Sequence, residues 1–128
     1  MQVILADDQA KVRSALRLLL EHQPNVKILG EAVDTTGLLD WVTAMCPDLV
    51  LLDWELPGLP AAALLPLLHD HCPALGVIAL SSRPETRQAA LEAGADAFAS
   101  KGDPPERLLM AMDEAMENRN RKENCHES

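Results

Sequence analysis

The chain has 128 residues, which is enough for one compact domain and too few for two domains of ordinary size. Hydrophobic residues make up 48% of it and aromatic residues only 2%, so the core must be built almost wholly from aliphatic side chains. The net charge of −9 argues against nucleic-acid binding by this segment, because a phosphate backbone requires a basic surface. No apolar run approaches the length of a membrane span, so contact with a membrane is not expected.

The cysteines and the lack of a signal peptide favour a reduced, cytoplasmic protein. Cys46, Cys72 and Cys125 include no CxxC pair, and an odd number of cysteines cannot all pair within one chain. Cys46 and Cys72 each precede a proline at an expected helix end, which indicates small apolar side chains in the core. The sulfurs are therefore expected to remain thiols, as is usual in the cytosol.

The first half of the chain predicts three strands separated by two helices. The expected strands are residues 3–6, 26–33 and 49–52, and the first and third of these are apolar throughout. The expected helices are residues 9–22 and 35–45, the second capped by Asp34. Strands that are apolar throughout, rather than alternating, are typical of a sheet covered on both faces.

The second half continues the alternation. A helix is expected to begin near Pro60, with Pro66 kinking or loosening it from inside. Strands are expected over residues 77–80 and 95–100. Between them, Ser82 and Glu85 have the spacing of a capping box for a helix that stops at Gly94.

A last helix is expected after a cap at Asp103. Its buried stripe is predicted to be Leu108, Leu109, Met112, Ala115 and Met116. Beyond Glu117 the composition turns polar, so the chain is expected to fray there. This divides it into a folded domain, residues 1–117, and a polar tail or linker start, residues 118–128.

Five strand–helix units indicate an α/β fold with a parallel sheet between two helical layers. Functional groups in such sheets gather beyond the carboxyl ends of the strands. The residues expected there are Asp7, Asp8, Asp53, Ser81, Ser82 and Lys101. Three carboxylates in one place require a positive charge, and an oxygen-rich pocket suits Mg²⁺ or Mn²⁺. With a lysine and a hydroxyl added, the set is suited to building and holding a phosphoryl group on a carboxylate.

Four segments in this order, "LADD", "LVLLDWELPG", "VIALSS" and "GADAFASK", resemble the receiver domains of two-component response regulators. The resemblance covers about residues 3–116. It implies a flavodoxin-like, doubly wound (βα)5 fold with strand order 2-1-3-4-5, and residues 1–117 as the receiver.

The resemblance also implies roles at the acidic site. Asp53 matches the phosphoacceptor, and it shares the metal ion with Asp8, the direct ligand of the acidic pair. Asp7 matches the residue that acts on the metal through water. Glu55 holds the position whose backbone carbonyl completes the metal shell. Lys101 matches the lysine that pairs with the phosphate, although Gly102 follows it where relatives often have proline.

Two further positions match the switch of the family, and three lie at the rim of the site. Ser81 matches the hydroxyl that moves to the phosphate, and Phe98 matches the aromatic switch residue. Glu55, Ser82 and Arg83 border the opening to the acceptor. The opposite charges of Glu55 and Arg83 are either a lid that closes over it or two solvated charges that never touch.

The resemblance implies a switch phosphorylated by a histidine kinase or a small phosphodonor, with no enzyme activity beyond gaining and losing its own phosphate. Phosphorylation would change its partner-binding face, and homodimers are one expected result. Whether the chain is the receiver part of a transcriptional regulator stays open. The alternatives are an interaction module not controlled by phosphate and a phosphatase of the haloacid-dehalogenase type. The phosphatase requires a second Asp where Glu55 stands. A flavin-binding domain of the flavodoxin type would require a Gly-rich phosphate loop after the first strand, and this sequence has none there.

Overall fold

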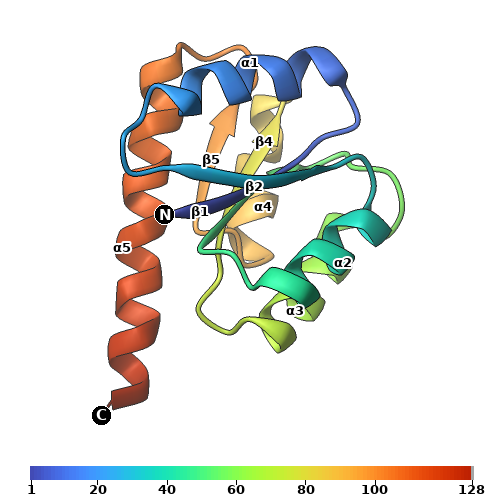
Figure 1. The fold of residues 1–128 in the computed structure, drawn as a ribbon. Coiled ribbons are helices and arrows are strands. Elements are labelled where there is room, and N and C mark those ends of the chain that lie inside the picture. Colours follow the sequence, from blue (N-terminus) through green and yellow to red (C-terminus); the bar gives the residue numbers. More distant parts are fainter. Residues whose placement is uncertain (128) are drawn as a thin grey trace.

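A computed structural model describes residues 1–127 and the side chains of residues 1–121. Five parallel strands form one sheet in the order β2-β1-β3-β4-β5, so the predicted strand order is confirmed (Figure 1). The strands are β1 (Gln2–Ala6), β2 (Lys27–Ala32), β3 (Leu49–Asp53), β4 (Gly76–Ser81) and β5 (Ala97–Ser100). The helices are α1 (Ala10–Glu21), α2 (Thr35–Met45), α3 (Ala61–His71), α4 (Arg87–Glu92) and α5 (Pro105–Glu127), and a short 3-10 turn, η1 (Pro84–Thr86), precedes α4.

The helices lie on both faces of the sheet because successive strand side chains point to opposite sides. Val3 and Leu5 pack with α1 and α5, whereas Ile4 and Ala6 pack with α2 and α3. All four of these strand residues are fully buried. α4 covers Ala79 on the same face as α2 and α3. The sheet is therefore buried on both sides, as the continuous apolar runs predicted.

The predicted helix cap is present at the start of α2 and absent at the start of α4. Asp34 caps α2 as predicted, since its carboxylate accepts from the Gly37 amide at 2.8 Å. The capping box expected at Ser82 is not formed, and α4 begins only at Arg87. The reason is that Arg83, which would be the first helical residue after a Ser82 cap, is extended (φ −112°, ψ 96°), and its amide donates to the Ser81 hydroxyl at 3.0 Å. The chain then turns through η1 before α4 starts.

The proline in α3 does not end that helix. Pro66 lies inside α3, which continues to His71, while Pro60 is the residue before its first turn. α3 therefore keeps its buried face of Ala61, Leu64, Leu65 and Leu68 against the sheet.

α5 continues past Glu117, where fraying was expected. The Asn118 amide donates to the Asp96 carbonyl at 3.0 Å, and Arg119 pairs with Asp48 at 3.0 Å. These contacts join α5 to the amino-terminal end of the sheet, and its last turns project beyond the sheet (Figure 1). The start of the expected tail is thus part of the packed helix, and Ser128 lies outside the described residues. Over the part of the chain described, no helix combines the length and apolarity that crossing a membrane requires.

The prediction that Cys46 and Cys72 are separate buried thiols is wrong. The two form a disulfide, with Cα atoms 5.8 Å apart, and Cys46 is exposed. Each residue is the C-cap of its helix, Cys46 of α2 and Cys72 of α3, and these helices pack side by side. The pairing depends on that tertiary approach, which cysteine spacing alone cannot reveal.

Candidate functional site

Three carboxylates meet at the carboxyl edge of the sheet. Asp7 directly follows β1, Asp53 is the last residue of β3, and Asp8 opens the β1–α1 turn. Each offers an oxygen within 4.8 Å of the other two. The Asp7 and Asp53 side chains are only 1% and 3% exposed, while Asp8 is exposed. Buried oxygens with one face open to solvent fit a hard divalent cation that keeps some of its water.

Lys101 supplies the one fixed positive charge in contact with these carboxylates within the described side chains. Its Nζ lies 2.8 Å from Asp7 Oδ2 and 3.3 Å from Asp53 Oδ1. Its backbone amide donates to the Ser81 carbonyl at 2.8 Å, which fixes the start of the β5–α5 loop beside β4. Burial lowers the pKa of Lys101, but the Asp7 hydrogen bond and the charges of Asp53 and Asp7 outweigh burial and leave the pKa raised. Lys101 is therefore a permanent cation beside Asp53.

Asp53 lies at the bottom of the site and its charge is only partly compensated. Burial raises the pKa of Asp53, and the charge of Asp7 adds to this. The Glu55 amide, which donates to Asp53 Oδ1 at 3.0 Å, and Lys101 oppose the rise without cancelling it. A second cation at the site would therefore stabilise the ionised carboxylate.

Asp53→Asn is expected to stabilise the metal-free protein at mildly alkaline pH. The raised pKa means that the folded state holds a proton on Asp53 more tightly than the unfolded state does. Its stabilising contribution is therefore complete at acidic pH and is lost as pH rises from the ordinary aspartate pKa through the raised one. Urea unfolding of both proteins across pH measures this. A variant that is less stable than the wild type at alkaline pH would contradict the assignment.

Ser81 and Glu55 form a direct contact across the site. The buried Ser81 hydroxyl donates to Glu55 Oε1 at 2.7 Å while accepting from the Arg83 amide. Within residues 1–121 no ion pair joins Glu55 to Arg83, so the lid formed by these two charges is not present. The reason is that the Glu55 carboxylate turns inward to Ser81. Of Arg83, only the backbone amide takes part in this contact, through its hydrogen bond to the Ser81 hydroxyl.

The predicted rim residues line a cavity of about 240 Å³ above Asp53. Its walls are formed by Asp8, Gln9, Asp53, Glu55, Ser82, Arg83 and Lys101. Phe98 lies elsewhere, partly buried against Ala79 and Ala90 between β5 and α4. The structure thus brings together all the predicted site residues except Phe98.

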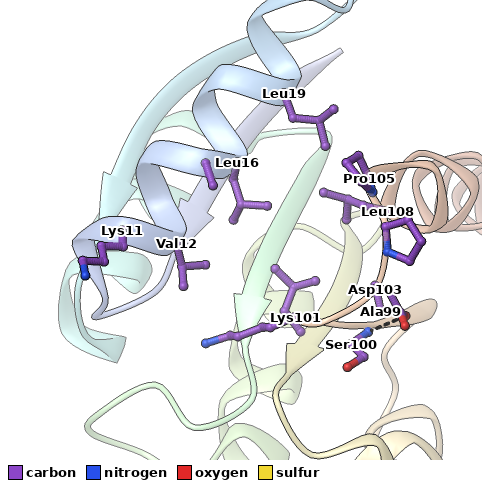
Figure 2. A pocket seen from close by; sticks show the side chains of 13 residues that line it. Lys11, Val12, Leu16, Leu19, Ala99, Ser100, Lys101, Asp103, Pro105 and Leu108 are labelled. Carbon is purple, nitrogen blue, oxygen red and sulfur yellow. Dashed lines mark hydrogen bonds between the residues drawn. The ribbon is translucent and has the colours of Figure 1, made fainter.

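A larger hollow of about 300 Å³ lies on the other side of Lys101 (Figure 2). Apolar side chains of α1, including Val12, Leu16 and Leu19, face Pro105 and Leu108 at the start of α5. Of the described residues, only Asp103 contributes a carboxylate to its wall. This groove lacks the converging oxygens needed for phosphoryl chemistry, which are confined to the smaller cavity.

Sequence reasoning missed the residues that hold the site loops. The Arg13 guanidinium, on α1, donates to the Asp7 carbonyl at 2.7 Å. Thr35 Oγ1, at the start of α2, accepts from the Leu59 amide at 3.0 Å and fixes the loop after Asp53. Gly58 in that loop has a φ of +117°, and a Cβ there would collide with Thr35. Of these, only the glycine next to a proline carried a signal in the sequence, namely a turn.

Known proteins share this fold and its sequence pattern. The sequence model of the family described as "Response regulator receiver domain" matches residues 3–113. The nitrate/nitrite response regulator protein NarL of Escherichia coli is 30% identical over 115 residues, which cover 88% of this chain and 53% of NarL. A protein-glutamate methylesterase/protein-glutamine glutaminase of Geobacter sulfurreducens is 36% identical over 102 residues, which cover 78% of this chain and 27% of that protein.

Solved structures agree. The response regulator domain of Thermotoga maritima CheB superposes with a TM-score of 0.80 at 26% identity, covering 91% of this chain and 96% of that one. The receiver domain of Salmonella enterica RcsB, determined with the phosphomimetic BeF3-, gives 0.80 at 27% identity, covering 88% and 86%. The chain thus spans about half the length of NarL and about a quarter of the methylesterase. From the family match and these likenesses, the chain belongs to the response regulator receiver domain family.

Proposed function

We propose that the chain is a phosphorylation switch whose acceptor is Asp53. The observation that carries this proposal is the place of the Asp53 carboxylate, at the bottom of an open cavity with Asp8 on one side and Lys101 on the other. A structural ion pair would not require the exposed third carboxylate of Asp8, which has no bonded partner among the described side chains.

In the proposed reaction, an Asp53 carboxylate oxygen attacks the phosphorus of a phosphohistidine or an acyl phosphate. The bond from phosphorus to the donor nitrogen or oxygen breaks, and the donor leaves with that electron pair. A divalent cation held by Asp8, Asp53 and the backbone carbonyl of Glu55, and by Asp7 through water, would neutralise charge on the transferred oxygens. Lys101 is placed to stabilise the product from the opposite side, and Ser81 carries a hydroxyl that can donate to it.

The test is intact-mass spectrometry after incubation with acetyl phosphate and Mg²⁺. One added phosphoryl group is expected, and none when EDTA removes the metal. No labelling by either acetyl phosphate or phosphoramidate would contradict the proposal and would favour an interaction module not controlled by phosphate.

Glu55→Ala is expected to speed phosphorylation by acetyl phosphate by less than about tenfold. The variant frees the Ser81 hydroxyl and removes a negative charge from the cavity wall, where an exposed charge contributes about 0 to 1 kcal/mol. Glu55→Gln is the matched control, because it removes the charge but keeps an acceptor for Ser81. Pseudo-first-order rates at low and high salt measure both effects. Unchanged rates in both variants would show that Glu55 does not restrict the site.

The partners are proposed from the family and from the location of the site. A histidine kinase is the expected donor, and a cytoplasmic location would place the chain beside it. The output is proposed to be a change in the partner-binding face, signalled through Ser81 and Phe98, with a homodimer as one form. A role in transcription regulation is suggested by the likeness to YhcZ of Bacillus subtilis, whose name describes it as a transcriptional regulatory protein. No enzyme activity on a second substrate is proposed, because the methylesterase matches this chain over only 27% of its length.

A further inference from the structure

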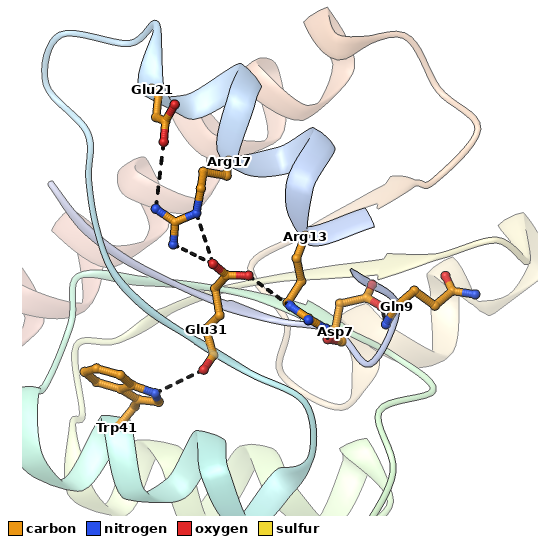
Figure 3. A network of polar contacts seen from close by, with 7 residues as sticks. All are labelled: Asp7, Gln9, Arg13, Arg17, Glu21, Glu31 and Trp41. Carbon is orange, nitrogen blue, oxygen red and sulfur yellow. Dashed lines mark hydrogen bonds and ion pairs between the residues drawn. The ribbon is translucent and has the colours of Figure 1, made fainter. Parts of the chain in front are cut away.

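A network of partly buried charged side chains joins α1 to β2 next to the acidic site (Figure 3). Glu31, in β2, accepts from two arginines of α1. Arg13 Nε lies 2.9 Å from Glu31 Oε1, and Arg17 Nη2 lies 2.6 Å from Glu31 Oε2. The hydrogen bond from Arg17, despite partial burial, holds the pKa of Glu31 below its ordinary value, with Arg13 adding to this. Glu31 is thus an anion shared by two cations.

Only one of the two arginines reaches the acidic site. Arg13 Nη1 donates to the Asp7 backbone carbonyl at 2.7 Å, so its guanidinium bridges Glu31 and the β1–α1 turn. Arg17 binds Glu31 and, at 3.8 Å, Glu21, but forms no hydrogen bond or ion pair with the described residues of that turn. The Arg13 side chain is 18% exposed, compared with 39% for Arg17. Arg13 and Arg17 therefore share the Glu31 carboxylate, but only Arg13 also binds the backbone of the acidic pair.

The acidic pair depends on its backbone for position. Asp7 is held by its own amide, which donates to the Ala32 carbonyl, and by its buried side chain. The exposed Asp8 side chain makes no hydrogen bond or ion pair with the side chains described up to residue 121. The next residue, Gln9, precedes α1 without a side-chain cap. The backbone that carries Asp8 is therefore held by two contacts, from the Gln9 amide to Asp7 Oδ1 at 2.8 Å and from the Arg13 guanidinium to the Asp7 carbonyl.

We infer that Arg13, oriented by Glu31, is a positioning residue that fixes the Asp7–Asp8 peptide for divalent-cation binding. The inference rests on the metal site of the proposed function. The guanidinium suits the role because it bonds in two directions from one rigid plane, which an ammonium on a flexible stem cannot reproduce. Groups that orient metal ligands typically contribute about 10- to 100-fold in affinity.

The experiment compares Mg²⁺ affinity, measured by calorimetry, in Arg13→Gln and Arg17→Gln. Each variant removes one ion pair with Glu31, but only Arg13→Gln releases the Asp7 carbonyl. Arg13→Gln is expected to raise the Kd for Mg²⁺ about tenfold, and Arg17→Gln by less than about twofold. Arg13→Lys should fall between Arg13→Gln and the wild type, since a lysine keeps one of the two contacts.

Urea unfolding of the same proteins separates positioning from stability. A purely structural role would lower the free energy of unfolding in both variants and leave both Kd values unchanged. That result, or equal weakening of Mg²⁺ binding in both variants, would overturn the inference. If Arg13→Gln does not fold, Glu31→Gln replaces it, with a rise in Kd that is expected to be smaller than about tenfold, because Arg13 keeps its bond to Asp7. An unchanged Kd in Glu31→Gln would also overturn the inference. A wild-type protein that binds no Mg²⁺ would instead contradict the metal site of the proposed function.

Discussion

Asp53→Asn is expected to abolish phosphorylation by acetyl phosphate in the presence of Mg²⁺. An amide has neither the charge nor the free oxygen nucleophile that the transfer requires. In the wild type the Glu55 amide donates to Asp53 Oδ1 at 3.0 Å. Asparagine has nearly the same shape and keeps an oxygen for this bond, so the loop after β3 should stay in place. Intact-mass spectrometry over a time course measures the loss.

The control for this variant is Asp40→Asn, which removes an exposed carboxylate from α2, away from the cavity. It is expected to label like the wild type. Labelling of Asp53→Asn at the wild-type rate and extent would mean that another residue is the acceptor. Because Asp53→Asn is expected to be at least as stable as the wild type at alkaline pH, loss of labelling could not be attributed to unfolding.

Asp8→Ala is expected to weaken Mg²⁺ binding far more than any other single change except those at Asp53. The exposed Asp8 faces the cavity and contributes a full negative charge to the donor set. Two unit charges about 4 Å apart, at an effective dielectric constant of about 20, attract each other by roughly 4 kcal/mol, which corresponds to about a thousandfold in Kd, and a loss of this order is expected for a divalent ion that keeps its other ligands. Calorimetric titration with Mg²⁺ measures the change, and an unaltered Kd would remove Asp8 from the ligand set.

Asp7→Ala should differ from Asp8→Ala in kind as well as in size. The Asp7 side chain is buried and bonded to Lys101 at 2.8 Å and to the Gln9 amide at 2.8 Å. Its removal leaves Lys101 with only the longer contact to Asp53, so the free energy of unfolding should fall together with the Mg²⁺ affinity. Asp8→Ala, at an exposed position without partners, should leave the stability of the metal-free protein nearly unchanged.

The positions of the acidic residues and the lysine could be predicted because they follow from topology. These charged residues lie at or just after the carboxyl ends of apolar strands, and the carboxyl ends of parallel strands lie at one edge of the sheet. Apolar patterning likewise predicted the two helical layers, whereas the strand order was implied by the family resemblance. Asp34 could be predicted as a cap because its partner, Gly37, is only three residues away.

What could not be predicted depends on which of several partners a side chain finds in the folded chain. Ser81 and Ser82 are adjacent and equally able to cap, and only the structure shows that Ser81 takes the Arg83 amide. Glu55 binds Ser81 rather than Arg83, a choice that their charges did not indicate. The disulfide and the Arg13 bridge join segments brought together by packing, Cys46 with Cys72 and α1 with β2. None of these contacts leaves a pattern in local sequence.

The central claim is that phosphate is carried by the Asp53 carboxylate, and chemical trapping of the acyl phosphate tests it most directly. Borohydride reduces an aspartyl phosphate to homoserine, which peptide mass spectrometry locates to a single residue. After incubation with acetyl phosphate and Mg²⁺, homoserine is expected at position 53 alone, and nowhere when Mg²⁺ or the donor is left out. Homoserine at another aspartate, or phosphorylated protein that yields no homoserine at position 53, would contradict the account.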